Sequence, residues 1–237
     1  MNKPIPVITI DGPVGAGKGT VAQILAKKLG WPLLDSGAVY RVLALTVIQN
    51  KIYTNNEEAI AAKAVDLNIE FKSPKRENSP CQVFLENQDV TDQIRTEAVG
   101  KTASIIAVYS KVRQALLKLQ RALRKPPGLI ADGRDMGTVV FPDATLKIFL
   151  TASVEERAKR RHQQLLENGI NVKLPALVQE IATRDARDEQ RAVSPLKPAD
   201  DAIIIDTTDL TIKDVVEKIT TVIPKISAAD YPGSRDK

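Results

Sequence analysis

The chain has 237 residues, of which 43% are hydrophobic and 27% are charged, and its formal net charge is +5. A chain of this length can bury one substantial core, so we expect a single domain over residues 1–237. No stretch approaches the roughly 18 uninterrupted apolar residues of a membrane span, and the first residues lack a signal-peptide pattern. The lone Cys81 cannot form an internal disulfide, which is typical of a reducing compartment. These features predict a cytoplasmic protein that does not act at a membrane.

Short apolar runs and helical patterns alternate along most of the chain. The apolar runs at 7–10, 32–34, 129–131, 146–150 and 202–205 predict buried strands. Helical spacing at 18–29, 39–49, 112–123, 154–167 and 174–187 predicts helices between or after them. Strands that alternate with helices indicate an α/β fold with a parallel sheet covered on both faces. Ligands of such sheets bind at the carboxyl ends of the strands.

One segment, at about 67–96, interrupts this alternation. Short alternating runs at 69–72, 82–86 and 88–90, separated by a polar turn at 73–80, predict a small antiparallel β insertion. At the other end of the chain, residues 227–237 include Pro232-Gly233-Ser234 and are predicted to be a frayed tail.

The strongest motif follows the first predicted strand. It has the spacing Gly-x4-Gly-Lys, between a strand and a helix, that marks a phosphate-binding loop. Glycines let several backbone N–H groups surround one phosphate, and the helix directs its positive N-terminal dipole at the same anion. The lysine adds a mobile positive charge for the β and γ phosphates of ATP. The predicted ATP-binding loop comprises Gly12, Pro13, Val14, Gly15, Ala16, Gly17, Lys18, Gly19 and Thr20.

The loop departs from the common pattern at one position. The residue after Lys18 is Gly19 instead of Ser or Thr, and a hydroxyl follows only at Thr20. This variant is typical of nucleoside monophosphate kinases rather than GTPases, and it leaves the Mg²⁺ ligand open. Either Asp35 or Asp132 could orient Mg²⁺ waters, and the sequence does not choose between them.

Three further blocks resemble the bacterial cytidylate kinases together with the loop. They are Leu-Leu-Asp-Ser-Gly at 33–37 with Tyr40-Arg41, Asp-Gly-Arg-Asp-Met-Gly at 132–137, and Arg184-Asp185-x-Arg187-Asp188 with Arg191-Ala192. The similarity extends from about residue 5 to residue 223. The block at 132–137 is much more specific than the loop, which many kinases share.

The resemblance implies a three-layer P-loop fold with a five-stranded parallel sheet and ATP- and Mg²⁺-dependent phosphorylation of CMP or dCMP. It implies that the insertion at about 67–96 binds the monophosphate and that a short helical lid occupies about 154–172. Carried over by position, the catalytic residues would be Lys18, Arg134, Arg157 and Arg161. The substrate-binding residues would be Ser36, Arg41, Ser104, Arg113, Asp132, Asp135, Arg184, Asp188 and Arg191.

The chemistry of these side chains suits the implied roles. Arg41 and Arg134 match phosphate oxygens, because a guanidinium group binds them in a bidentate way. Asp135 beside Arg113 would read the amine and ring nitrogen of cytosine, and uracil would leave both groups unpaired. Positions 184, 188 and 191 are spaced to share one helical face. His162 is the only histidine, so a zinc site is not expected.

Three alternatives differ from this interpretation. A GTPase would need an Asn-Lys-x-Asp segment, which the chain lacks. A nucleic-acid-binding protein would favour aromatic residues for base stacking, and aromatics make up only 4% of the chain. Another small-acceptor P-loop kinase, acting on UMP, AMP or shikimate, is separated from a CMP kinase by the acceptor it uses. We expect a monomer whose partners are small nucleotides and ATP.

Overall fold

The computed structural model describes residues 4–72, 81–167, 169–191 and 193–223. Its centre is a five-stranded parallel sheet in the order β2-β6-β1-β7-β8. All five predicted strands are present, with ends that differ by at most one residue. The strands are β1 (Val7–Asp11), β2 (Leu33–Asp35), β6 (Leu129–Asp132), β7 (Leu146–Thr151) and β8 (Ile203–Asp206).

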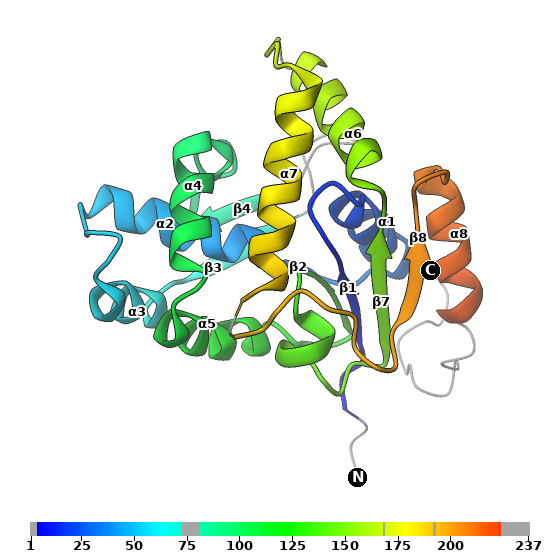
Figure 1. Cartoon of the computed structure of the whole chain (residues 1–237). Helices are drawn as coiled ribbons and strands as arrows, with labels where there is room; N and C mark the ends of the chain where they lie inside the picture. The colour runs from blue at the N-terminus through cyan, green and yellow to red at the C-terminus, as the bar shows by residue number, and fades with distance from the viewer. Residues whose placement is uncertain (1–3, 73–80, 168, 192, 224–237) are drawn as a thin grey trace.

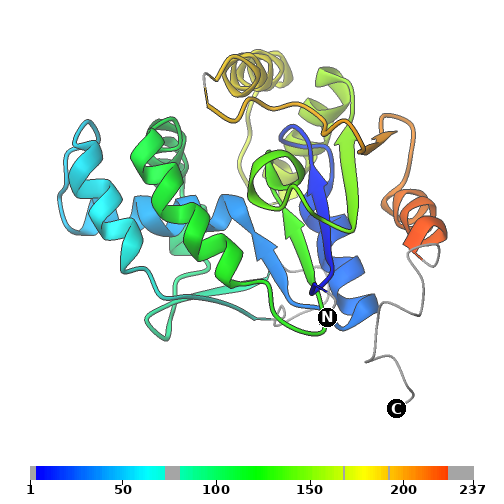
Figure 2. The same ribbon diagram turned by 90° about the horizontal axis from the view of Figure 1, so that it is seen from below.

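Helices cover both faces of this sheet, as the sequence predicts (Figures 1 and 2). Because successive strand residues point to opposite faces, Val7 packs into one core and Ile8 into the other. The core around Ile8 is closed by α1 (Lys18–Leu29) and α8 (Ile212–Val222). The core around Val7 is closed by α2 (Ser36–Gln49), α3 (Glu57–Val65), α4 (Glu97–Ile106) and α5 (Ser110–Ala122).

The predicted insertion is a separate three-stranded antiparallel sheet beside α2–α5. Its strands are β3 (Ile69–Lys72), β4 (Gln82–Leu85) and β5 (Gln88–Asp89), followed by the short turn η1 (Gln93–Arg95). Glu86 and Asn87, between β4 and β5, both have positive φ, as a two-residue hairpin turn requires. The polar turn predicted at 73–80 lies outside the described residues.

Two helices rise beyond the carboxyl ends of the strands (Figure 1). α6 (Val154–Glu167) runs away from the sheet, and α7 (Leu174–Glu189) returns beside it. They share a small core of Ala158, Leu177 and Ile181. The lid predicted at about 154–172 begins with α6, and the tail predicted at 227–237 lies outside the described residues.

Three helices and two short turns were not predicted from the sequence. The helices are α3, α4 and α8, and the turns are η1 and the π-helical segment η2 (Met136–Val140). Among the described residues, no helix is both long and apolar enough to cross a bilayer.

Candidate active site

The phosphate loop joins β1 to α1, which begins at Lys18. Gly12 has a φ of 144°, and a Cβ atom there would lie 2.0 Å from the carbonyl oxygen of Leu150, so only glycine fits. The Lys18 ammonium donates a hydrogen bond to the Pro13 carbonyl, 2.8 Å away, at the other end of the loop. The lysine therefore already folds back over the backbone that would hold the phosphates.

Two carboxylates lie beside the loop on neighbouring strands. Asp35 and Asp132 are direct partners in the register of β2 and β6. Asp35 also caps α2, because its Oδ1 accepts from the N–H of Ala38 at 2.9 Å. A Cβ on Gly19 would lie 3.4 Å from Asp132 Oδ2, an ordinary contact distance, so the position after the lysine lies directly beside this carboxylate.

Lys18 and Asp132 influence each other's charge. Burial raises the pKa of Asp132 to about 7, opposed by the positive charge of Lys18 and reinforced by the negative charge of Asp35. Burial likewise lowers the pKa of Lys18 to about 8, and Asp132 acts in the opposite direction. Both groups therefore titrate near neutral pH, as groups at functional sites often do.

A cluster of arginines gathers around Asp188, which is 2% exposed. Its two carboxylate oxygens accept from Arg134, which follows β6, and from Arg191. Burial and the nearby charge of Arg134 lower the pKa of Arg184, one turn earlier on α7, to about 10. Uncompensated positive charge is costly to bury, so this cluster is suited to an anionic ligand.

A second ion pair joins Arg113 on α5 to Asp135, which is also buried. Arg113 donates in addition to the Ala107 carbonyl at 3.2 Å and lies over the Tyr40 ring, 5.9 Å from its centre. Burial raises the pKa of Tyr40 to about 12, so its hydroxyl remains protonated. The pair predicted to read the base is thus already assembled.

The remaining predicted substrate residues come from α2 and α4. Arg41 donates to the Ile94 carbonyl at 2.8 Å, and Gly100 gives it space, since a Cβ there would lie 3.0 Å from its guanidinium. Ser36 is buried in the first turn of α2. Ser104 donates its hydroxyl proton to the Gly100 carbonyl at 3.1 Å, which leaves the oxygen as an acceptor.

The two arginines predicted on the lid have different surroundings. Arg157 is 3% exposed, and its guanidinium donates to the carbonyls of Ala152 and Val14 and to the Asp185 carboxylate. Arg161 is exposed and donates to Gln164, one turn along the same helix. Of the two, Arg161 is the one whose guanidinium is free of buried protein acceptors.

The structure corrects one feature of the predicted helical face. α7 ends at Glu189, so Arg191 lies beyond the helix, although its guanidinium still reaches Asp188. Sequence reasoning gave no role to Asp11, which holds the backbone just after Asp135, or to Asp185, which pairs with Arg157. A signal for Asp185 existed, because it continues the inward-facing series Leu177, Ile181 at helical spacing.

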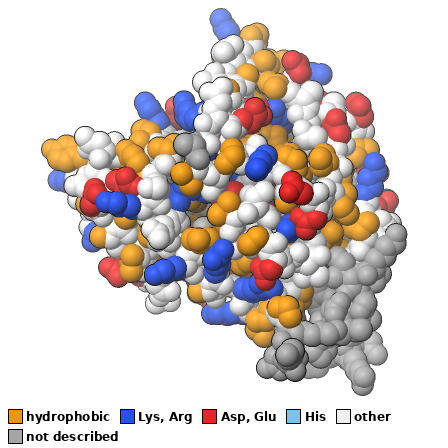
Figure 3. Space-filling model, turned by 60° about the horizontal axis from the view of Figure 1, so that its bottom comes forward, with side chains coloured by type: hydrophobic (Ala, Val, Ile, Leu, Met, Phe, Trp, Pro, Cys, Tyr) orange, Lys and Arg blue, Asp and Glu red, His pale blue; other side chains and the backbone are white. Residues whose placement is uncertain are grey.

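The face of the molecule shown in Figure 3 mixes blue Lys and Arg side chains with red Asp and Glu and with apolar side chains. Its positive charge is therefore dispersed on this face, unlike the continuous basic stripe that tracks a nucleic-acid backbone. The concentrated positive charge described above lies at the strand ends, around Lys18 and Asp188.

The profile of the cytidylate kinase family matches residues 8–225. The chain belongs to the cytidylate kinase family. Curated cytidylate kinases from Pseudomonas aeruginosa (strain UCBPP-PA14) and Azotobacter vinelandii are each 56% identical to it, covering 92% and 96% of this chain and 95% and 97% of the relative. The cytidylate kinase of Yersinia enterocolitica is 53% identical over 96% of this chain and 98% of its own length.

Membership of the cytidylate kinase family confirms the resemblance found in the sequence motifs. Among solved structures, a gluconokinase from Sinorhizobium meliloti 1021 aligns with a TM-score of 0.47 and 14% identity, covering 98% of this chain and 99% of its own. A likeness that slight adds nothing to the family assignment, which depends on the sequence relatives.

Proposed function

We propose that this chain transfers the γ-phosphoryl group of ATP to CMP or dCMP, producing ADP and CDP or dCDP. One observation carries the proposal: the Lys18 phosphate loop lies within electrostatic reach of Arg134 and Arg184, which belong to the arginine cluster around Asp188. In this proposal the donor phosphate site and the acceptor phosphate site are adjacent. Family membership favours CMP over the alternatives UMP, AMP and shikimate.

The ATP side of the proposal uses residues 12–20. The backbone N–H groups of the loop and the N-terminus of α1 surround the phosphates, and Lys18 neutralises charge on the β and γ groups. The pKa of Lys18 is lowered to about 8 but remains above 7, so its side chain is still mostly cationic at pH 7.

The acceptor side uses the residues predicted from the resemblance. Arg41, Arg134, Arg184 and Arg191 supply charge for the CMP phosphate. Asp188 and Ser36 are assigned to the sugar and phosphate, and Asp132 lies between the two phosphate sites. Asp135, Arg113 and Ser104 are assigned to cytosine, with the Arg113–Asp135 pair already in place before the base arrives.

The reaction itself is an in-line displacement. An oxygen of the CMP phosphate forms a bond to the γ-phosphorus as the bond to the β–γ bridging oxygen breaks, and ADP leaves with that electron pair. A phosphate dianion needs no general base, so the protein contributes positioning and charge. Arg161 is the lid arginine proposed to cover the transferring group, and closure excludes water as a competing acceptor.

The strand ends also suit Mg²⁺. This ion prefers one or two carboxylates together with substrate phosphates, and Asp35 and Asp132 form such a pair beside the loop. When bound, Mg²⁺ would neutralise negative charge on the ATP phosphates. We also propose that the enzyme is monomeric and cytoplasmic. In this proposal the insertion at about 67–96 binds the monophosphate, and the lid at about 154–172 covers ATP.

Product analysis tests this function. We expect incubation with ATP, Mg²⁺ and CMP to give ADP and CDP in equal amounts, with little inorganic phosphate. The enzyme recovered after incubation with ATP alone should carry no phosphate. Release of inorganic phosphate in place of CDP would identify a nucleotide hydrolase and overturn the proposal.

A further inference from the structure

Helix α6 carries two arginines, Arg157 and Arg160, that are held by protein groups close to the phosphate loop. They lie three residues apart, so they belong to the same stretch of the helix surface. The next arginine, Arg161, is exposed. Arg161 lies one turn after Arg157 on the same side of the helix, so this side contacts the surroundings of the loop near the start of α6 and is exposed one turn farther along.

Arg157 binds the backbone of the phosphate loop at Val14. Its Nη1 donates to the Val14 carbonyl at 3.1 Å, its Nε donates to the Ala152 carbonyl at 2.9 Å, and its Nη2 pairs with Asp185 on α7. A Cβ on Gly15 would lie 3.0 Å from the Arg157 Cβ, so the loop backbone packs directly on the arginine stem. All three nitrogens are thus engaged by protein.

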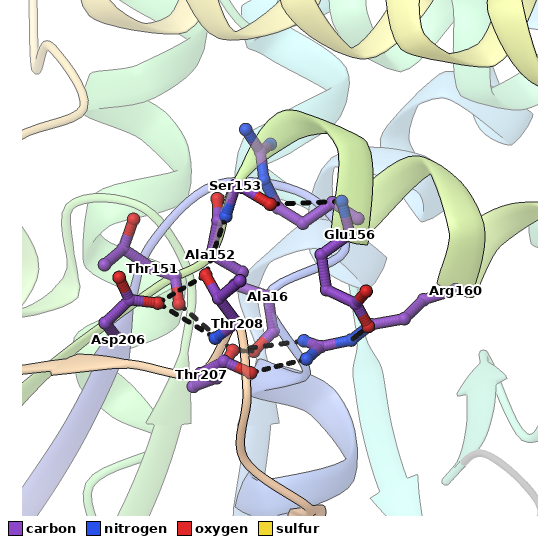
Figure 4. Close-up of polar contacts among 10 residues, drawn as sticks. Ala16, Thr151, Ala152, Ser153, Glu156, Arg160, Asp206, Thr207 and Thr208 are labelled. Atoms are coloured by element: carbon purple, nitrogen blue, oxygen red, sulfur yellow. Dashed lines mark hydrogen bonds and ion pairs between the residues drawn. The ribbon is translucent and has the colours of Figure 1, made fainter.

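Arg160 holds the other side of the loop through Thr207, as Figure 4 shows. Its Nη1 donates to the Thr207 hydroxyl at 3.1 Å and its Nη2 to the Thr207 carbonyl at 2.5 Å. The Thr207 hydroxyl, 2% exposed as a residue, lies 3.0 Å from the Thr151 carbonyl and 3.4 Å from the Ala16 carbonyl in the loop. Glu156 completes the set by accepting from Arg160 Nε at 3.0 Å.

These contacts determine which way the loop amides point. A carbonyl and the following N–H belong to one planar peptide, and in a trans peptide they point in opposite directions. The one cis bond among the described residues is elsewhere, at Pro126–Pro127. Holding the Val14 carbonyl toward Arg157 therefore turns the next amide, that of Gly15, the other way. The Ala16 carbonyl shares the single Thr207 hydroxyl proton with the nearer Thr151 carbonyl, so its contact with Thr207 is the weaker one, and it favours the same arrangement for the amide of Gly17. Amides arranged in this manner are what a phosphate loop offers to its ligand.

We propose that Arg157 and Arg160, with Thr207 as intermediary, are positioning residues that fix the phosphate loop for ATP. The inference rests on the proposed function and refines it, since it gives Arg157 a supporting role and leaves contact with the transferring group to Arg161. Substitution of a residue that positions the loop should therefore weaken ATP binding and leave CMP binding nearly unchanged.

Two substitutions test the arrangement. Thr207→Val keeps the shape of the side chain but removes the hydroxyl that meets Thr151, Ala16 and Arg160. Arg157→Lys keeps the charge beside Asp185 but loses the planar fork that spans three acceptors. We expect each to raise the ATP KM, and the ADP Kd measured by calorimetry without CMP, about tenfold, which is about 1.4 kcal/mol. The CMP KM should change by less than about twofold.

Two matched variants serve as controls. Thr207→Ser retains the hydroxyl and should restore nearly normal ATP affinity. Lys159→Gln removes an exposed charge from the same helix and should leave both KM values unchanged. If Arg157→Lys does not fold, Thr207→Val alone decides the question.

The outcomes separate this inference from the proposed function. Equal increases in both KM values would indicate a general structural role and overturn the inference. A lower kcat with unchanged ADP affinity would place Arg157 on the reacting phosphoryl group and also overturn it. If the unmodified enzyme binds ADP but does not phosphorylate CMP, the proposed function fails, and the inference is still judged by ADP affinity.

Discussion

The carboxylate of Asp11 accepts a hydrogen bond from the backbone N–H of Gly137, 2.8 Å away, and a second from Met136 at the same distance. Asp11 is the last residue of β1 and immediately precedes the phosphate loop. Met136 and Gly137 begin the π-helical turn that follows Arg134 and Asp135. A single buried side chain therefore ties the ATP-binding loop to the segment that carries two acceptor-site residues.

We expect Asp11→Asn to disturb the acceptor site. The amide keeps one acceptor oxygen but turns its NH₂ group toward a backbone donor, so one buried N–H of Met136 or Gly137 loses its partner at a cost of about 1–3 kcal/mol. The melting temperature should fall and the CMP KM should rise about tenfold or more. Asp143→Asn, at an exposed carboxylate that pairs with Arg124, is the matched control and should change neither value much.

Steady-state kinetics and thermal unfolding measure these effects. An Asp11→Asn enzyme with normal stability and a normal CMP KM would show that the link between loop and turn has no consequence for substrate binding.

Lys18→Ala should abolish most turnover without unfolding the protein. The Lys18 side chain contributes one hydrogen bond to the loop, to Pro13, but supplies the positive charge expected at the ATP phosphates. Loss of such a group typically costs a factor of about 10²–10³ in kcat. Lys28→Ala, exposed on the same helix, is the control for helix stability. Turnover near the normal rate in Lys18→Ala would contradict the assignment of the loop.

The pH dependence should reflect the coupled pair of Lys18 and Asp132. Asp132, with a pKa raised to about 7, becomes anionic as the pH rises, and Lys18, with a pKa lowered to about 8, loses its charge soon afterwards. We therefore expect kcat/KM for ATP to rise through about pH 7 and to fall above about pH 8. Because Lys18 and Asp132 are coupled, the two pKa values of this profile describe the pair and are not assigned to either residue alone.

Asp35→Asn provides a directional test of that profile. The negative charge of Asp35 helps to raise the pKa of Asp132, so its removal should move the acid limb to lower pH. Asparagine is also a good N-cap residue, so α2 should remain capped. An acid limb that stays in place would show that Asp132 does not govern it.

Asp135→Asn should weaken the discrimination between cytosine and uracil. The amide removes the counter-ion of buried Arg113 and presents both a donor and an acceptor to the base. We expect kcat/KM for CMP to fall by about 10² or more, and the preference for CMP over UMP to shrink. An unchanged ratio of CMP to UMP turnover would remove Asp135 from the base-binding site.

The sequence predicted the features that depend on local patterns. The five strands and the phosphate loop follow from apolar runs and glycine spacing within about 20 residues. The helix α8 was missed although Thr211 and Asp214 form a capping box, which is a readable local signal. The insertion was predicted because its alternating runs are short, polar on one side and close together.

Other features could not be predicted because they depend on residues far apart in the chain. The π-helical turn at Met136–Val140 is held by Asp11, 125 residues earlier. The burial of Arg157 depends on Asp185 and Val14, which no local pattern on α6 indicates. The family resemblance therefore led us to predict Arg157 as a lid residue, but it did not give the direction in which the guanidinium points.

The most direct test of the account is the choice of phosphate acceptor. ADP release from ATP and Mg²⁺ would be measured with CMP, dCMP, UMP, AMP and shikimate supplied separately. We predict strong turnover with CMP and dCMP and little with the other three, because we propose that the Arg113–Asp135 pair binds cytosine and that the arginine cluster around Asp188 binds the monophosphate. Preferred turnover of UMP, AMP or shikimate, or no acceptor-dependent ADP release at all, would contradict it.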